Sequence, residues 1–285
     1  MYWRLYEAVV KMTYLEVYLA VIYGFPSVLH FAGFVLLYKA NRVLPNQRLI
    51  TMNLAVTEMI YCMVQVIYHA LIAADLLTDV ADIILEFTLV SYFCAIRFAI
   101  LHIIIDRFLD IWLNIKYPIY INSRKILISI AIQWTFSSCF GLIHRLIFKF
   151  KEIDITLYSD VPLDVLIIVI ALLTTLYFFR KLKRIQPNPT SGKNCRQIRS
   201  RVWLRLKIPL LMVLTFIIFN ASSTILIFFT DGENPNSAEQ FQLAYTFLEI
   251  FGWISDALIY ILLQKRVRRL LASMCKGENR NLSAD

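Results

Sequence analysis

The sequence predicts an all-α membrane protein, a single bundle of seven transmembrane helices followed by a short amphipathic helix. The first observation is composition: 59% of the 285 residues are hydrophobic and 17% are charged. Soluble domains are about 45–50% apolar and about 25% charged, so an ordinary soluble enzyme is excluded. The second is a series of apolar runs close to the roughly 20 residues that a bilayer core requires. The third is the gathering of Lys and Arg in alternate connecting segments.

The predicted spans follow one another along a single domain that covers residues 1–285. Polar or charged stretches separate them, and the fifth is the shortest. The stretch before the first span lacks a basic region and a small-residue cleavage site, so residues 1 to about 16 are expected to form a short tail and not a signal peptide. The spans lie at about 17–38, 49–73, 83–105, 126–148, 163–179, 208–229 and 240–263.

Orientation follows from the basic residues. With the N-terminus outside, the inner segments hold 23 of the 29 Lys and Arg residues and the outer segments hold five, with Arg97 inside the third span. The positive-inside rule then places the N-terminus outside the cell and the C-terminus in the cytoplasm. The net charge of +9 reflects an inner surface that faces anionic lipid and partners, so nucleic acid is not implied.

Acidic residues show the opposite distribution. Ten of them, including Asp164, are expected on or near the outer loops. Such a rim favours either a cationic ligand or simple solvation of the surface.

The third inner loop, residues 180–207, carries ten basic residues and no acid, and the segment PNPTSG interrupts it. Two interpretations stay open: contact with lipid headgroups, or a docking site for an acidic partner to which Arg199 and Arg201 contribute. After the last span, residues 264–276 form a basic amphipathic segment expected to lie on the membrane surface. Cys275 at its end is a candidate for palmitoylation.

The five cysteines form neither a CxxC pair nor a metal spacing with His, so zinc and redox motifs are absent from the sequence. Cys62, Cys94 and Cys139 fall inside apolar runs, where they are expected to pack as small apolar side chains. We expect no extracellular disulfide, no metal and no cofactor.

Five ionisable residues fall inside the predicted spans: Glu58, Glu86, Arg97, Glu249 and Asp256. Each costs at least about 2.5–3.5 kcal/mol at the bilayer centre unless it is paired or hydrated, so each is a functional hypothesis. The seven-residue spacing of Glu249 and Asp256 places them on one helix face. Arg97 is expected to be a structural counter-ion to one of the four acids.

Motifs in the right spans and order resemble those of the rhodopsin-like (class A) G-protein-coupled receptors. The second span reads NLAVTE, from Asn53 to Glu58, similar to the family's NLAxxD. The third ends Asp106-Arg107-Phe108, similar to DRY, and Pro118 follows in the second inner loop. Trp134 lies in the middle of the fourth span, and the seventh ends DALIY at Tyr260, similar to NPxxY.

The resemblance implies a plasma-membrane receptor that passes an extracellular signal to a heterotrimeric G protein, without enzymatic chemistry. It implies that Asp106 holds Arg107 at rest and releases it to the G protein. It gives Tyr177 and Tyr260 the role of tyrosines that swing inward on activation. Glu58 matches the family's sodium-linked carboxylate, and Asp256 beside it could share a proton or a cation.

Several family positions differ in this sequence. The sixth-span CWxP tryptophan and proline fall near Asn220 and Ser222, and the NPxxY proline is Ala257. The missing third-span disulfide and the Asp at position 256 bear a faint resemblance to the melanocortin, adenosine and cannabinoid receptors.

Two ligand-binding residues that are typical of the family are absent from this sequence, and their absence narrows the class of ligand. The amine-binding Asp position is Leu89 and the seventh span has no Lys, which argues against monoamine and retinal ligands. A small or lipid-like ligand is expected, in a pocket formed by Glu86, Leu89, Phe93, Phe219 and Glu249; for Phe93 and Phe219 the alternative is bundle packing.

Two other functions stay open. A small-solute or ion transporter could use the intramembrane carboxylates, although no internal repeat supports it. A signalling-impaired receptor could act as a partner in a homo- or heterodimer, although no GxxxG interface supports that function. An enzyme is not expected, because no HExxH motif or Ser/His/Asp constellation is present.

Overall fold

The computed structural model describes residues 2–39, 45–113, 116–151, 156–184, 210–221 and 235–263, and residues 267, 268 and 272. Every regular element in this part of the chain is a helix, which confirms the predicted all-α class. The elements are α1 (Tyr2–Lys39), α2 (Pro45–Ala73), α3 (Asp79–Leu113), α4 (Tyr117–Tyr120), α5 (Ser123–Lys151), α6 (Thr156–Arg184), the π-helical η3 (Phe216–Ala221) and α9 (Pro235–Leu263).

Five of these helices are long and apolar enough to cross a membrane. Their apolar parts are Thr13–Lys39, Asn46–Ala73, Asp79–Leu113, Ser123–Ile147 and Ala244–Leu262. Shorter apolar helices, Val161–Tyr177 and Leu210–Phe219, coincide with the predicted fifth and sixth spans. That these two segments cross the membrane therefore stays a prediction, and so does the total of seven spans. Of the predicted sixth span, the structure describes only residues 210 to 221.

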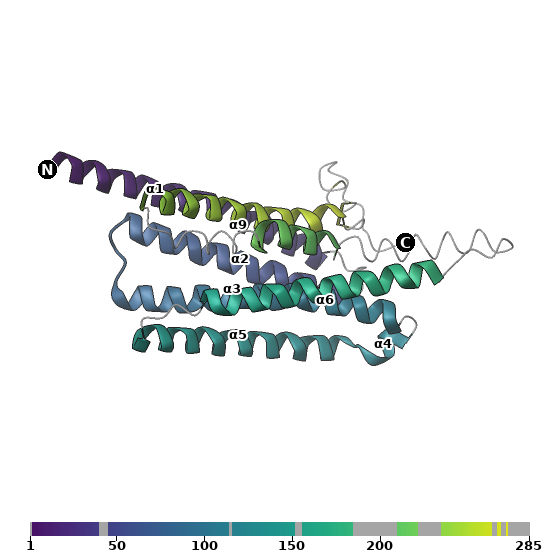
Figure 1. Cartoon of the computed structure of the whole chain (residues 1–285). Coiled ribbons are helices and arrows are strands. Elements are labelled where there is room, and N and C mark those ends of the chain that lie inside the picture. The colour runs from purple at the N-terminus through teal and green to yellow at the C-terminus, as the bar shows by residue number, and fades with distance from the viewer. Residues whose placement is uncertain are drawn as a thin grey trace.

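The long helices lie side by side along one direction, with α3 in the middle of the bundle (Figure 1). It packs against α2, α5 and α6, while α1 packs along α2 and α9. The segment predicted to form a short N-terminal tail is helical, because α1 begins at Tyr2 and continues into the predicted first span.

The exposed faces of these helices are apolar, as a lipid environment requires. Val28, Phe31, Ile132 and Leu173 are all more than half exposed. Polar side chains, by contrast, are buried between the helices, among them Glu58, Arg97, Glu249 and Asp256. Apolar helices of this length, with their polar groups facing the bundle interior, are compatible with a helical membrane protein.

The turn between α2 and α3 closes with a left-handed residue. Asp75 has a φ of 54°, and its N–H and that of Leu76 donate to the carbonyls of Ile72 and Leu71, at 3.0 and 2.9 Å. This pair of bonds satisfies the last carbonyls of α2 in a Schellman motif. It lets α3 return beside α2 after a short connection.

The cysteine expectation holds in part. Cys62 and Cys94 are free and buried, as predicted for packing residues, whereas Cys139 is free and exposed. The packing prediction for Cys139 is wrong, because the residue lies on the face of α5 that turns away from the bundle. Cys275 and most of the predicted amphipathic helix fall outside the described residues, although Val267 is buried in the core.

Candidate functional site

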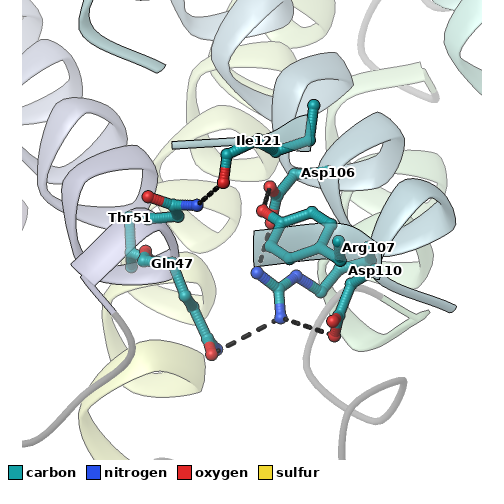
Figure 2. Close-up of polar contacts among 8 residues, drawn as sticks. Gln47, Thr51, Asp106, Arg107, Asp110 and Ile121 are labelled. Carbon is teal, nitrogen blue, oxygen red and sulfur yellow. Dashed lines mark hydrogen bonds and ion pairs between the residues drawn. The ribbon is translucent and has the colours of Figure 1, made fainter. Parts of the chain in front are cut away.

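An ionic cluster lies where α3 meets α4. Arg107 donates from one guanidinium nitrogen to Asp106, and its other terminal nitrogen lies 3.6 Å from an Asp110 oxygen, three residues along α3. The guanidinium also reaches the side-chain oxygen of Gln47 on α2, at 3.5 Å. Figure 2 shows the arginine between the two carboxylates and Gln47. All three charged residues are buried.

Tyr117 on α4 completes the cluster by donating its hydroxyl hydrogen to Asp106. Burial, and then the Asp106 carboxylate, raise the pKa of Tyr117 above its usual value. Because the phenol therefore stays neutral, it is a permanent donor to Asp106 and ties the short loop helix to α3.

The loop helix is also fastened to α2. Asn46 donates to the carbonyl of Ile121 at 2.9 Å and accepts from the Ser123 hydroxyl at 3.1 Å. Pro118 lies in the first turn of α4, where its fixed φ suits a helix start and its missing N–H leaves no bond unmade. Its ring is exposed, so it contributes backbone shape to this surface and no contact to the cluster.

A second polar cluster lies deeper in the bundle. His30 on α1 places its Nδ1 3.1 Å from a Glu58 oxygen and contacts the hydroxyl of Tyr260. Thr215 donates to Asp256 at 2.9 Å, and the Glu58 and Asp256 side chains interact with each other. Glu58 and Asp256, predicted to be neighbours, are therefore brought together by α2 and α9.

The carboxyl groups in this cluster need a proton or a cation. Apart from His30 beside one Glu58 oxygen and the Thr215 hydroxyl on Asp256, no donor among the described residues satisfies these two buried carboxyl groups. Two ionised carboxylates side by side in the interior repel each other, so one proton between them, or a small cation, removes that repulsion. Within the described residues no group of three or more His, Cys, Asp or Glu side chains could hold a metal ion, so a cation here would also need hydroxyl or water oxygens.

A third cluster surrounds Glu249. Tyr23 on α1 and Tyr61 on α2 each donate to one oxygen of this carboxylate at 2.7 Å. Tyr61 also stacks on Phe93, with 5.9 Å between ring centroids. Of the predicted pocket residues, the structure thus joins Phe93 and Glu249 through Tyr61.

The other predicted pocket residues lie in separate surroundings. Glu86 pairs with Arg145 on α5, at a half-exposed site. Leu89 is partly buried against the core, and Phe219 stacks on Phe251 with centroids 6.4 Å apart. The five residues therefore do not surround one space among the described residues.

Arg97 has a different partner from the four that were predicted. Its guanidinium donates to Asp164 on α6 at 2.7 and 3.4 Å and lies over the Phe93 ring, 3.7 Å from the centroid. The predicted counter-ion role of Arg97 holds, because the guanidinium pairs with a carboxylate and its charge also acts on Glu249, one of the four acids. Asp164 itself is buried, so it does not contribute to an exposed acidic rim. The first apolar turns of α6 pack against α3 and turn Asp164 inward.

The remaining predicted residues are placed as follows. The Tyr177 ring meets the Phe108 ring edge-on at 5.3 Å, one residue along from Arg107. Trp134 donates to Asn53 at 2.9 Å, so the family-like residues of the second and fourth spans are hydrogen-bonded. Arg199, Arg201 and Cys275 lie outside the described residues.

Sequence reasoning missed Gln47, Tyr117, Tyr23 and Tyr61. A tyrosine in an apolar run gives no indication in the sequence that it belongs to a polar cluster. These three tyrosines do so because each donates to a carboxylate on another helix. Asp110 did carry a signal, because it lies three residues after Arg107 on a helix.

Comparisons with known proteins place the chain in no family. No family model matches it, and no curated protein matches it either.

Proposed function

We propose that this protein is a divergent rhodopsin-like receptor that passes an extracellular signal, from a small or lipid-like ligand, to a heterotrimeric G protein. The observation that carries the proposal is the buried cage of Asp106, Asp110 and Tyr117 around Arg107. Such a cage keeps the guanidinium neutralised until its side chain turns away from the two carboxylates of its own helix, which is what a resting receptor needs at its inner face.

The motif order supports the same function. Trp134 is hydrogen-bonded to Asn53 on a neighbouring helix, and His30 joins Glu58 to Tyr260. Seven spans with the N-terminus outside would put the Arg107 cage, α4 and the basic segment 180–207 on the cytoplasmic side, together with Arg199 and Arg201.

The test is nucleotide exchange by a panel of G proteins in membranes that contain the full chain. Asp106→Asn removes a charge-assisted bond worth about 1.5–3 kcal/mol and is expected to raise ligand-independent exchange about tenfold or more. Adding Arg107→Ala to Asp106→Asn, in a double variant, is expected to abolish that increase. Arg124→Ala, which removes an exposed basic residue at the same end of the bundle, is the matched control and is expected to leave exchange unchanged.

Silence of Asp106→Asn with every G protein, for protein verified at the cell surface, would contradict the coupling function. It would favour the alternative that this chain is a signalling-impaired receptor that acts as a dimer partner. The absence of the family's sixth-span tryptophan and proline and of its seventh-span proline supports that alternative.

A transporter is the second candidate, because His30, Glu58 and Asp256 form a continuous buried polar group. Proton or sodium flux into vesicles containing the purified chain distinguishes it. Flux that Glu58→Gln abolishes, without any nucleotide exchange, would favour transport over reception.

A further inference from the structure

The groove between α3 and α5 is a cavity, and Asp106 is its one lining residue that belongs to the ionic cluster of the proposed function. It has a volume of about 450 Å³ and extends from Phe98 to Leu109 along α3 and from Lys125 to Phe136 along α5. The eleven helical steps from the first to the last of these residues, at 1.5 Å each, make it about 16 Å long. Both helices are among those long and apolar enough to cross a membrane, so in a bilayer the open side of the groove would lie against lipid.

Most of the lining is apolar and open to the surroundings. Ile105, Ile132 and Phe136 line it and are 38%, 64% and 57% exposed. An apolar channel of this kind, bounded by two helices that lie in the bilayer, suits a hydrocarbon chain.

One end of the groove is positively charged. Lys125 lines it there, and only one of its ammonium hydrogens is used within the described residues, by the Tyr120 carbonyl at 2.8 Å. Asp106 also lines this end, but Arg107 and Tyr117 already bind its carboxylate. The ammonium group of Lys125 therefore keeps hydrogens free for a ligand at this end, so the end favours an anion.

A polar position lies between the charged end and the apolar channel. The Nδ1 atom of His102 is buried without a hydrogen-bond partner among the described residues, and Ser129 and Gln133 line the same space. A buried polar nitrogen without a partner costs about 1–3 kcal/mol, so a ligand with a polar group at this depth would remove that cost.

We propose that this groove binds one anionic glycerophospholipid from the leaflet at the α4 end of the bundle. Lys125 binds the headgroup, His102 and Ser129 meet the glycerol ester region, and one acyl chain lies along Ile132 and Phe136. In the predicted orientation this is the cytoplasmic leaflet, where anionic lipids are concentrated. Lipid binding needs no coupling to a G protein, so its test is independent of the test of the proposed function.

The test is native mass spectrometry of the full chain in detergent, with either dioleoyl phosphatidylserine or dioleoyl phosphatidylcholine added. One phosphatidylserine molecule is expected to stay bound, in preference to phosphatidylcholine. Loss of one charge-assisted contact by Lys125→Gln is expected to lower the bound fraction about tenfold. Lys125→Arg keeps the charge and is expected to keep the lipid. Arg124→Gln, which removes the same charge from the neighbouring position outside the groove, is expected to change nothing.

A second pair of variants tests the channel. Ile132→Trp fills the groove and is expected to abolish retention of phosphatidylserine, whereas Leu127→Trp, on the opposite face of α5, is the control and is expected to retain it. Equal retention of the two lipids, or retention unaffected by both Lys125→Gln and Ile132→Trp, would overturn the proposal. The melting temperature of each variant verifies that it is folded.

Discussion

Tyr117 illustrates how much depends on one hydroxyl group in this protein. Its phenol donates to Asp106, and Asp106 in turn holds Arg107. Because the raised pKa of Tyr117 keeps the group neutral, the bond is present at every physiological pH. The residue therefore connects the loop helix α4 to the ionic cluster.

At this scale we predict that Tyr117→Phe raises ligand-independent nucleotide exchange several-fold, because Asp106 loses a hydrogen bond worth about 1–2 kcal/mol. Tyr120→Phe is the matched control, since Tyr120 lies on the same helix with a ring that is 53% exposed. Exchange rates of the two variants in the same membranes are compared. Equal rates would show that the tyrosine does not restrain the cluster.

The Arg97–Asp164 pair supplies a second prediction at the residue scale. Removing one partner of a buried ion pair costs about 3–5 kcal/mol, whereas replacing both by apolar residues is often neutral. We expect Arg97→Met or Asp164→Leu alone to lower the melting temperature in detergent strongly, and the double variant to recover most of the loss. Arg145→Met, at the half-exposed pair with Glu86, is the control and should cost about 1 kcal/mol or less. A double variant as unstable as the single ones would contradict the role of the pair.

At the scale of helices, α3 and α5 approach closely where Gly141 faces Ser91. A Cβ added at Gly141 would lie 3.1 Å from the Phe87 carbonyl oxygen and 3.2 Å from the Ser91 Cβ, so the missing side chain is what lets the helices meet. Close backbone approach of this kind is a common basis of helix association in membranes.

We therefore predict that Gly141→Ala destabilises the bundle by about 1–3 kcal/mol through overpacking. Gly24→Ala is the matched control, because a Cβ there meets nothing within 4 Å and alanine favours the helix by about 1 kcal/mol. Thermal unfolding of both variants in the same detergent gives the comparison. A Gly141→Ala protein as stable as Gly24→Ala would mean that α5 can shift away from α3 without cost.

At the scale of the whole molecule, α1, α2 and α9 enclose the polar groups that an isolated helix could not keep in lipid. Each of the three contributes to the cluster of His30, Glu58 and Asp256, and the sixth segment adds Thr215. Four segments contribute side chains to this cluster. Binding of a proton or a cation to its carboxyl groups should therefore change the stability of the whole bundle.

The corresponding prediction concerns sodium. Sodium chloride is expected to raise the melting temperature of the detergent-solubilised chain above the value in potassium chloride at equal ionic strength, because the smaller ion suits two carboxylates and hydroxyl oxygens. Glu58→Gln and Asp256→Asn should each abolish the difference, while Glu249→Gln, whose carboxylate is held by two tyrosines, should keep it. A difference that survives both of the first two variants would place the effect elsewhere.

The sequence alone determined the class of this protein and the position of its helices. Apolar runs of bilayer length and a low charged fraction leave few alternatives to a helical membrane protein, because backbone groups in lipid must bond within their own helix. The adjacency of Asp106 and Arg107, and the face shared by Glu249 and Asp256, also follow from helical spacing. Glu58 and Asp256, predicted to be neighbours, are confirmed as such.

Only the tertiary structure decided which polar groups meet across helices. Arg97 bonds to Asp164, Tyr117 to Asp106 and two tyrosines to Glu249, and none of these pairs is visible in the sequence. The physical reason is that the rotation and depth of each helix fix its partners, and packing against several neighbours sets both. Helical periodicity determines which residues of one helix share a face, but the packing of the bundle determines which residues of other helices that face contacts.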